Sequence, residues 1–89
     1  MKRWTVVFRA LANINRLRIL RMLISGKHMT VTEIAAELEI SLTATSNHLT
    51  ILKDLDVLEA HGTEGHVFYF VNTDMPDDFR RIIAVAVRK

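Results

Sequence analysis

The segment SLTATSNHLTIL, residues 41–52, holds a dense group of uncharged side chains that form hydrogen bonds. Its Ser, Thr and Asn side chains both donate and accept, and an Asn amide can bind adenine through two hydrogen bonds at once. Ser46 and His48 lie two residues apart, so on a helix they point to different faces and do not form a nucleophile–base pair. The segment therefore favours recognition by hydrogen bonding over catalysis.

A helix over this segment would place the polar groups on one face. At 100° per residue, seven positions from Leu42 to Asp54 fall on one arc of about 140°, and the apolar residues other than Leu42 fall on the other side. His48 lies within the apolar arc, which predicts a hydrogen-bonded packing residue rather than a ligand or a base contact. The polar arc lacks the Glu residues usual on a surface helix, and short side chains allow close approach to DNA. The candidate DNA-binding residues on this arc are Leu42, Thr43, Ser46, Asn47, Thr50 and Lys53.

Other site chemistries find little support in the sequence. Cysteine is absent, which excludes disulfides, thiolate metal sites and cysteine nucleophiles. His61 and His66 flank a predicted hairpin turn, but without suitable acidic partners they favour phosphate contact over a zinc site. With no carboxylate pair and no glycine-rich phosphate loop, the sequence predicts neither an enzyme nor a metal or other cofactor.

The length of the chain limits its organisation. Its 89 residues are enough for one domain with one modest core, so we expect a single domain over residues 1–89. No apolar run approaches the roughly 20 residues of a membrane-spanning helix. Arg9 interrupts the stretch that a secretory signal would need to be apolar. We therefore expect a soluble cytoplasmic protein.

Charge is unevenly divided along the chain. Residues 1–27 hold seven basic groups and no acid, for a net charge of +7, and residues 80–89 add four basic groups. Residues 28–79 hold one base against ten acids, for a net charge of −9. Two interpretations remain open: a nucleic-acid surface, or ends that neutralise the middle within the fold or across a dimer. The same choice applies to Arg16, which can contact phosphate or pair with an acid.

Periodicity predicts the elements that position these groups. Apolar residues at i, i+3, i+4 and i+7 predict a first helix at about residues 3–12 and a last helix at about 75–88. Between them we expect three further helices and then two β-rich runs around GTEG, which indicate a hairpin. The expected fold class is mainly α with a small β-hairpin, in the order α-α-α-α-β-β-α.

Residues typical of helix ends mark most of these boundaries. Asn13, Thr30 and Ser41 are predicted N-caps of the second, third and fourth helices. The third helix begins with a capping box, TVTE, and the second is expected to end at Gly26. Asp74 is the predicted N-cap of the last helix.

The first and last helices carry more apolar side chains than a chain of this size readily covers. A small domain buries only about 60% of the surface that its unfolded chain exposes. Core packing accounts for part of both stripes, and we favour a dimer interface for the rest. The candidate interface residues are Trp4, Val7, Phe8, Leu11, Phe79, Ile82, Ile83 and Val87.

From Phe8 to Val71 the chain resembles the ArsR/SmtB-type winged-helix repressors. The segments that match are, in order, ALANINRLRIL, EIAAELEIS, TSNHLTIL and FYF. The resemblance implies a winged helix-turn-helix homodimer, paired through its first and last helices, that binds an inverted-repeat operator in double-stranded DNA and blocks transcription. The fourth helix would be the recognition helix. The residues expected to hold phosphates are Lys53, Arg16 and, on the wing, His61, Thr63 and His66.

The chain departs from this family at its metal-binding positions. Thr30 and Thr32 stand where the family's best-known site has two Cys residues, and the last helix has no His. Neither familiar metal site is therefore expected. The sequence leaves open whether a small molecule, a partner protein or pH is sensed.

Two further departures concern backbone and charge. Glu39 and Asp56 occupy turn positions where the family often has Gly, so a left-handed backbone is expected there. The wing lacks the usual Arg, and Glu59 and Glu64 lie nearby. These acids support an alternative function, a winged-helix protein-interaction module with weak or lost DNA binding.

Overall fold

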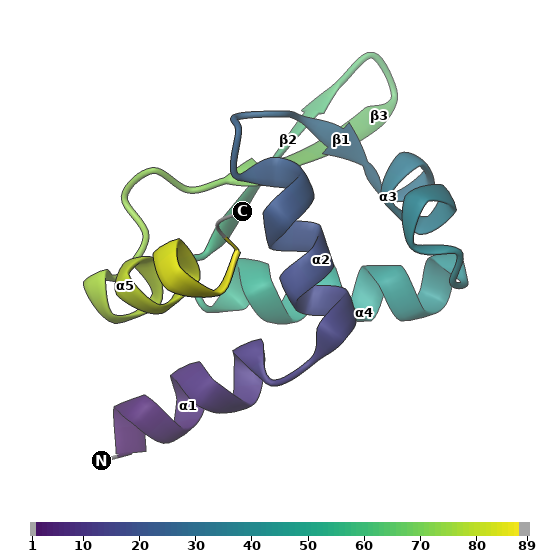
Figure 1. The fold of residues 1–89 in the computed structure, drawn as a ribbon. Helices are drawn as coiled ribbons and strands as arrows, with labels where there is room; N and C mark the ends of the chain where they lie inside the picture. The colour runs from purple at the N-terminus through teal and green to yellow at the C-terminus, as the bar shows by residue number, and fades with distance from the viewer. Residues whose placement is uncertain (1, 88–89) are drawn as a thin grey trace.

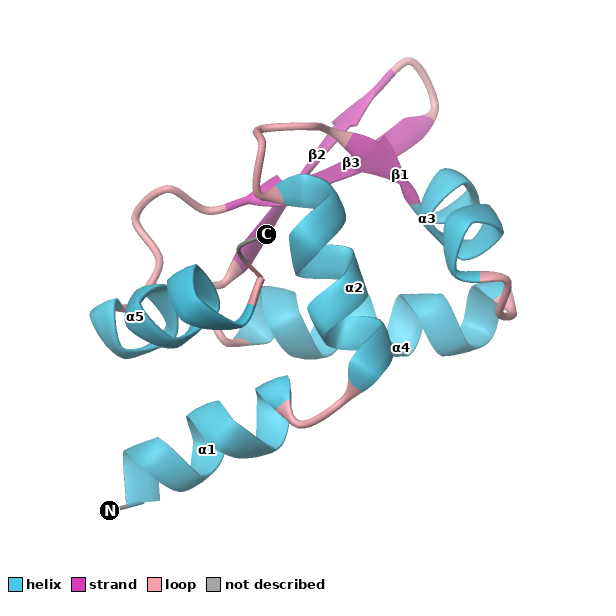
Figure 2. Ribbon diagram, in the orientation of Figure 1, coloured by secondary structure: helices cyan, strands magenta, loops and turns pink. Residues whose placement is uncertain are grey.

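The chain follows the order α1–α2–β1–α3–α4–β2–β3–α5 in a computed structural model that describes residues 2–87 (Figure 1). The elements are α1 (Lys2–Leu11), α2 (Ile14–Leu23), β1 (Met29–Thr30), α3 (Val31–Leu38), α4 (Leu42–Asp54), β2 (Leu58–Thr63), β3 (His66–Val71) and α5 (Asp77–Ala86). Helices α2, α3 and α4 lie together below the sheet, and α1 and α5 lie side by side at the other end (Figure 2). The predicted fold class is confirmed.

The sheet contains one strand that the sequence did not predict. Its order is β1-β3-β2, and both pairs are antiparallel. Strand β1 has two residues, which pair with Tyr69 and Phe68 of β3. Two residues cannot show the alternation by which a strand is recognised, and Thr30 also serves as the N-cap of α3.

Three of the predicted helix caps are confirmed. The Asn13 side chain accepts hydrogen bonds from the amides of Asn15 and Arg16 at 2.9 and 3.1 Å. Both halves of the capping box at the start of α3 are formed. The Ser41 hydroxyl accepts from the Ala44 amide at 3.0 Å, so α4 begins where predicted.

Two boundary predictions are wrong. Helix α2 ends at Leu23 with Ile24 as its cap, and Gly26 takes a left-handed conformation (φ +99°) only two residues later. Helix α5 begins after Pro76, and Asp74 instead lies in a turn, where its amide donates to the Asn72 side chain at 2.9 Å. An Asx-type turn therefore competes with the cap, because Asn bonds readily to a backbone amide two residues on.

The core takes side chains from all five described helices and from β2. Leu20, Leu49 and Leu52 are fully buried at its centre. Thr45 is also fully buried, and its hydroxyl donates to the Ser41 carbonyl oxygen at 2.8 Å. That bond satisfies the one buried polar side chain among the described residues, so α4 packs without an orphaned polar group.

The terminal helices contribute more to this core than predicted. Val7, Leu11, Phe79, Ile83 and Val87 are each at most 7% exposed within one protomer. The prediction that these five residues form a dimer interface is therefore wrong, because α1 and α5 pack on each other and cover them. Ile82 is half-buried, while Trp4 and Phe8 remain 39% and 55% exposed. Their rings stack on each other with centroids 5.8 Å apart.

An ion pair joins the two terminal helices. The Arg3 guanidinium donates to both carboxylate oxygens of Asp78, at 2.5 and 3.2 Å. It also lies over the Phe79 ring, 5.1 Å from the centroid. This contact holds the pKa of the Asp78 carboxyl below its usual range. Arg3 belongs to the basic segment of residues 1–27 and Asp78 to the acidic segment of residues 28–79. Here, then, a basic terminal residue neutralises an acidic one within the fold.

Within residues 2–87, three residues other than glycine have a left-handed backbone. Glu39 (φ 58°) ends α3 and Asp56 (φ 63°) follows α4, as predicted, and Glu64 (φ 49°) lies in the turn of the hairpin. Such a conformation strains a side chain with a Cβ atom by roughly 1–2 kcal/mol. At Glu39 the left-handed conformation ends α3 abruptly, so that α4 can begin after two further residues.

We therefore expect Glu39→Gly to stabilise the protein. Glycine removes the left-handed strain at an exposed position, but it also raises the conformational entropy of the unfolded chain. The net increase in the free energy of unfolding should be about 0.5–1 kcal/mol. The matched control is Glu37→Gly, inside the same helix, which should destabilise by about 0.5–1 kcal/mol. Urea unfolding monitored by circular dichroism measures both. Destabilisation by both substitutions would contradict a strained Glu39.

Candidate nucleic-acid interface

Helix α4 presents its polar arc to solvent. The seven arc positions are all exposed: Leu42, Thr43, Ser46, Asn47, Thr50, Lys53 and Asp54. On the opposite side Thr45, Leu49 and Leu52 are buried. The amphipathic orientation predicted for α4 is thus confirmed, and six candidate DNA-binding residues lie together on one open surface.

A short turn between α3 and α4 sets the direction of that surface. The Ile40 amide donates to the Ala35 carbonyl oxygen at 3.3 Å, which closes the end of α3. Leu38 on α3 and Leu49 on α4 are both buried in the common core. Two short helices joined by a three-residue turn, with the second helix open to solvent, make a helix-turn-helix.

The hairpin of β2 and β3 places the predicted wing residues on one face. His61 pairs with Phe68, and Thr63 pairs with His66. Because residues directly opposite each other share a face, as do residues two apart, all three predicted wing contacts lie on the outer face. They are also all exposed. His61 and His66 are diagonal rather than opposite neighbours.

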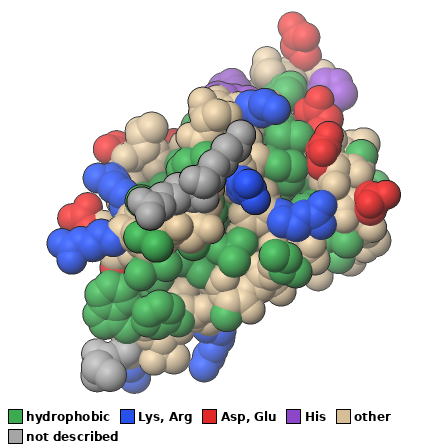
Figure 3. Space-filling view, in the orientation of Figure 1, with side chains coloured by type: hydrophobic (Ala, Val, Ile, Leu, Met, Phe, Trp, Pro, Cys, Tyr) green, Lys and Arg blue, Asp and Glu red, His purple; other side chains and the backbone are tan. Residues whose placement is uncertain are grey.

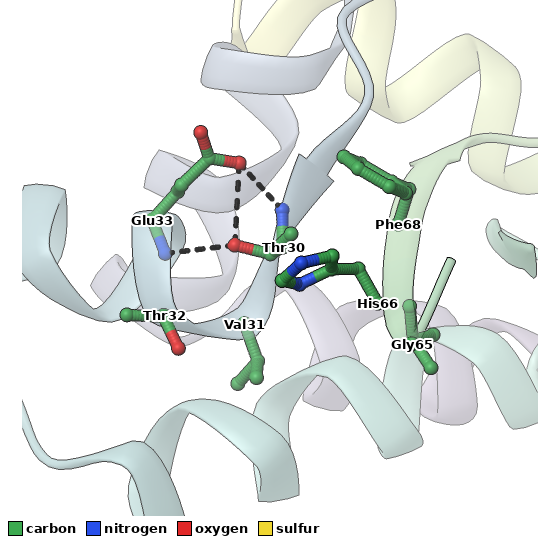
Figure 4. Close-up of a pocket in the computed structure, with 8 residues that line it drawn as sticks. Thr30, Val31, Thr32, Glu33, Gly65, His66 and Phe68 are labelled. Carbon is green, nitrogen blue, oxygen red and sulfur yellow. Dashed lines mark hydrogen bonds between the residues drawn. The ribbon is translucent and has the colours of Figure 1, made fainter. Parts of the chain in front are cut away.

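A groove separates the wing from the start of α3. It has a volume of about 630 Å³. Strand β1 ends at Thr30, so the first residues of β3 pair only with β2, and their other edge runs alongside the first turn of α3. The His66 imidazole projects from β3 toward Thr30, whose capping box with Glu33 forms the other wall (Figure 4). The Glu33 carboxylate is held in that box, at 2.9 Å from the Thr30 amide.

Positive charge is scarce around these elements. Lys53 is the one Lys or Arg between residues 41 and 71, and it shares a shallow pocket with Asp56 and Glu59. On the face shown in Figure 3, acidic side chains lie over α3 and at the wing tip, while Lys and Arg lie over α2. The candidate interface therefore offers many hydrogen-bonding groups and few cations.

Arg16 has a structural role that the sequence did not predict. Its guanidinium donates to the carbonyl oxygens of Ala10 at 2.6 Å and Arg9 at 3.3 Å, near the C-terminus of α1. A third bond, at 3.3 Å, joins Nη1 to Nδ1 of His48 on α4. Among the described residues it forms no ion pair with an acid. The available signal was the helix break ANIN just before Arg16, since the last carbonyls of a helix lack partners.

His48 is the packing residue that its place in the apolar arc predicted. A guanidinium only donates, so Nδ1 of His48 must accept, and the ring is the neutral tautomer with its proton on Nε2. Partial burial lowers the pKa of His48, and the positive charge of Arg16 lowers it further. Arg16 and His48 thus link α1, α2 and α4.

Within residues 2–87, no three His, Asp or Glu side chains are grouped as metal ligands. None of the helices described there is both long and apolar enough to cross a membrane.

A helix-turn-helix followed by a two-stranded wing defines a winged helix-turn-helix protein. Residues 11–61 match a family described as "Helix-turn-helix domain". The transcriptional repressor SdpR of Bacillus subtilis is 36% identical over 72 residues, which cover 81% of this chain and 79% of SdpR. The chain belongs to the ArsR/SmtB-type family of winged helix-turn-helix transcriptional regulators.

Two further relatives support this family. The cadmium resistance transcriptional regulatory protein CadC of Listeria innocua is 36% identical over 64 residues, covering 72% of this chain. The chain spans about half of CadC, 54% of its length. A homodimeric winged helix-turn-helix DNA-binding domain from Mycobacterium bovis, described as a possible ArsR-family transcriptional regulator, superposes with a TM-score of 0.75 at 31% identity. The superposition covers 94% of this chain and 74% of that one.

The His48 environment predicts a loss of stability in mild acid. Because the folded-state pKa of His48 is lowered, the unfolded chain takes up a proton near pH 6.5 while the folded protein does not. The free energy of unfolding should therefore fall as the pH drops below about 6.5 and should not respond to this group at higher pH. Urea titrations from about pH 8 to about pH 5 measure the effect.

A neutral replacement isolates this residue. His48→Gln keeps an acceptor for Arg16 but does not titrate, so its stability should fall less steeply in acid than that of the wild type. Thr50→Gln, at an exposed position of the same helix, is the control and should keep the wild-type profile. Identical profiles for wild type and His48→Gln would rule out a contribution from His48.

Proposed function

We propose that this chain is a homodimeric transcriptional repressor that binds an inverted-repeat operator in double-stranded DNA. The observation that carries the proposal is the exposed arc of α4, whose Thr, Ser and Asn side chains stand on the second helix of a helix-turn-helix. Hydroxyl and amide groups at these positions suit the edges of bases in the major groove. Membership of a family of transcriptional regulators supports the same function.

The contacts divide into two groups. The residues proposed to enter the major groove are Leu42, Thr43, Ser46, Asn47 and Thr50. Those proposed to contact phosphates are Lys53 and, on the wing, His61, Thr63 and His66. Arg16 acts indirectly in this scheme, because at least three of its N–H groups are bonded to the protein itself. It fixes the inner side of α4 through His48.

The terminal helices supply the proposed dimer contact. Trp4 and Phe8 form an exposed aromatic pair on α1, and on α5 Val85 is 69% exposed beside the half-buried Ile82. Hydrophobic side chains gather over α1 and next to α5 in Figure 3. A two-fold contact through this patch would cover it and set two recognition helices about 34 Å apart, one turn of DNA. The homodimeric neighbour from M. bovis supports such an arrangement.

Phe8→Glu should convert the dimer to a monomer. The substitution places a charge in a desolvated contact, yet Phe8 is 55% exposed within the protomer, so folding should be nearly unaffected. Sedimentation velocity at about 10–50 µM protein measures the change. Ile24→Glu, at an exposed position on the far end of α2, is the matched control and should remain dimeric. A monomeric wild type at these concentrations would contradict the dimer.

Asn47→Ala should weaken operator binding selectively. Loss of a bidentate base contact should cost about 1–3 kcal/mol at the selected site, with little change on random-sequence duplex. Fluorescence anisotropy against both duplexes measures the difference, once the operator has been selected from a random library. An equal loss on both duplexes would mean that Asn47 does not read bases.

The random duplex also distinguishes this function from the alternative protein-interaction module. With few cations at the interface, affinity should fall with salt less steeply than for a protein that contacts 8–10 phosphates. Absence of any binding at about 50 mM salt would overturn the DNA-binding proposal, since non-specific affinity is mostly electrostatic. It would favour the interaction module, which the acids Glu59 and Glu64 beside the wing residues support.

A further inference from the structure

A second groove lies between α1 and α4, away from the surface proposed to face DNA. It has a volume of about 240 Å³. Its walls are Val6, Arg9 and Ala10 of α1, Arg16 of α2, Ile51 of α4 and Leu55, the residue that caps α4. Ile51 and Leu55 belong to the arc of α4 opposite the exposed polar one, so an occupant would not compete with DNA for the same side chains.

The apolar walls of this groove are open to solvent. Val6 is 38% exposed and Ile51 is 39% exposed, although each faces the neighbouring helix across the groove. Leu55, which also lines the groove, is half-buried. These three side chains leave apolar surface that a small apolar group would cover.

The charge at the rim of the groove has one sign. Both ionisable side chains that line it are arginines, and no Asp or Glu of the described residues lines it. The Arg16 guanidinium is engaged with α1 and His48. The exposed Arg9 guanidinium forms no hydrogen bond or ion pair among residues 2–87. A planar guanidinium beside apolar surface is suited to a carboxylate, which it can bind through two parallel hydrogen bonds.

We propose that this groove binds a small amphipathic anion, a monocarboxylate with a short aromatic or branched hydrocarbon tail. The carboxylate pairs with Arg9, and the tail packs on Val6, Ile51 and Leu55. The groove is smaller than the roughly 300–1,000 Å³ of pockets for drug-sized ligands, which limits the ligand to about a dozen non-hydrogen atoms.

Because of where the groove lies, a bound ligand would regulate DNA binding. This consequence rests on the proposed function. Helix α1 carries the proposed dimer contact and α4 the proposed base contacts, and Arg16 joins the two beside the groove. A ligand that changes the spacing of α1 and α4 would change DNA affinity, and DNA would change ligand affinity by the same factor. Ligand binding itself requires no DNA.

Calorimetric titration of the full chain with 4-phenylbutyrate, in the absence of DNA, tests the proposal. Two probes of matched shape, neutral 4-phenylbutan-1-ol and cationic 4-phenylbutylamine, separate charge from hydrophobicity. We expect the anion to bind at least about tenfold more tightly than either, because a charge-assisted hydrogen bond contributes about 1.5–3 kcal/mol. Equal binding of all three probes would overturn an anion site.

Two substitutions locate the binding. Arg9→Gln should weaken 4-phenylbutyrate binding about tenfold. Val6→Glu should abolish it by placing a carboxylate on the exposed wall. Arg21→Gln is the matched control, since Arg21 is exposed on α2 and lines a different pocket, and it should bind like the wild type. Unchanged binding by Arg9→Gln, or an equal loss in Arg21→Gln, would overturn the assignment.

A second copy of the chain is the competing occupant. Titration of the Phe8→Glu variant tests it, because that variant is designed to be monomeric. Equal affinity in wild type and variant supports the proposal. Binding seen only in the variant would show that the partner protomer covers the groove, and would overturn it. A failure of the DNA-binding proposal leaves all these titrations interpretable, because none of them contains DNA.

Discussion

The hydrogen bonds of Arg16 connect the parts of the molecule that must keep a fixed relation to one another. One guanidinium bonds two carbonyl groups near the end of α1 and one imidazole nitrogen on the inner side of α4. Because a guanidinium is planar and has five donors in fixed directions, it restricts both helices at once. The proposed dimer helix and the proposed recognition helix are therefore joined by a single side chain. His48 must remain neutral for its part of this contact to persist.

The base contacts proposed for α4, with few cations around them, would favour selectivity over general attraction to DNA. Phosphate neutralisation by Lys and Arg supplies most non-specific affinity, and here Lys53 is the sole such residue from residue 41 to residue 71. Hydroxyl and amide groups act only where base edges match them. A dimer would then matter for affinity as well as for symmetry, because two weak contacts joined in one molecule bind more tightly than either alone.

Packing of the terminal helices adds apolar side chains from both ends of the chain to the common core. Phe79 and Ile83 of α5 are buried in the same core as Val7 and Leu11 of α1. The Arg3–Asp78 ion pair joins the same two helices at the surface. Among residues 2–87, the large hydrophobic side chains that remain exposed are the Trp4–Phe8 pair and seven aliphatic residues: Val6, Ile14, Ile24, Leu42, Ile51, Val67 and Val85. An exposed aromatic pair on a small domain is typical of a surface that another molecule covers.

The sequence by itself determined the features that depend on near neighbours in the chain. Helical periodicity placed Asn47 outside and Leu49 inside, and the caps at Asn13 and Ser41 follow from bonds that span two or three residues. The hairpin follows from strand propensity around a glycine-bounded turn. Tertiary structure decided what depends on distant partners: strand β1, the bonds from Arg16 to α1 and α4, and the burial of Ile83 within one protomer. An apolar stripe shows that one side of a helix will be buried. Only the packed fold decides whether that side packs on its own chain or on another, because the hydrophobic effect does not depend on which apolar surface covers the stripe.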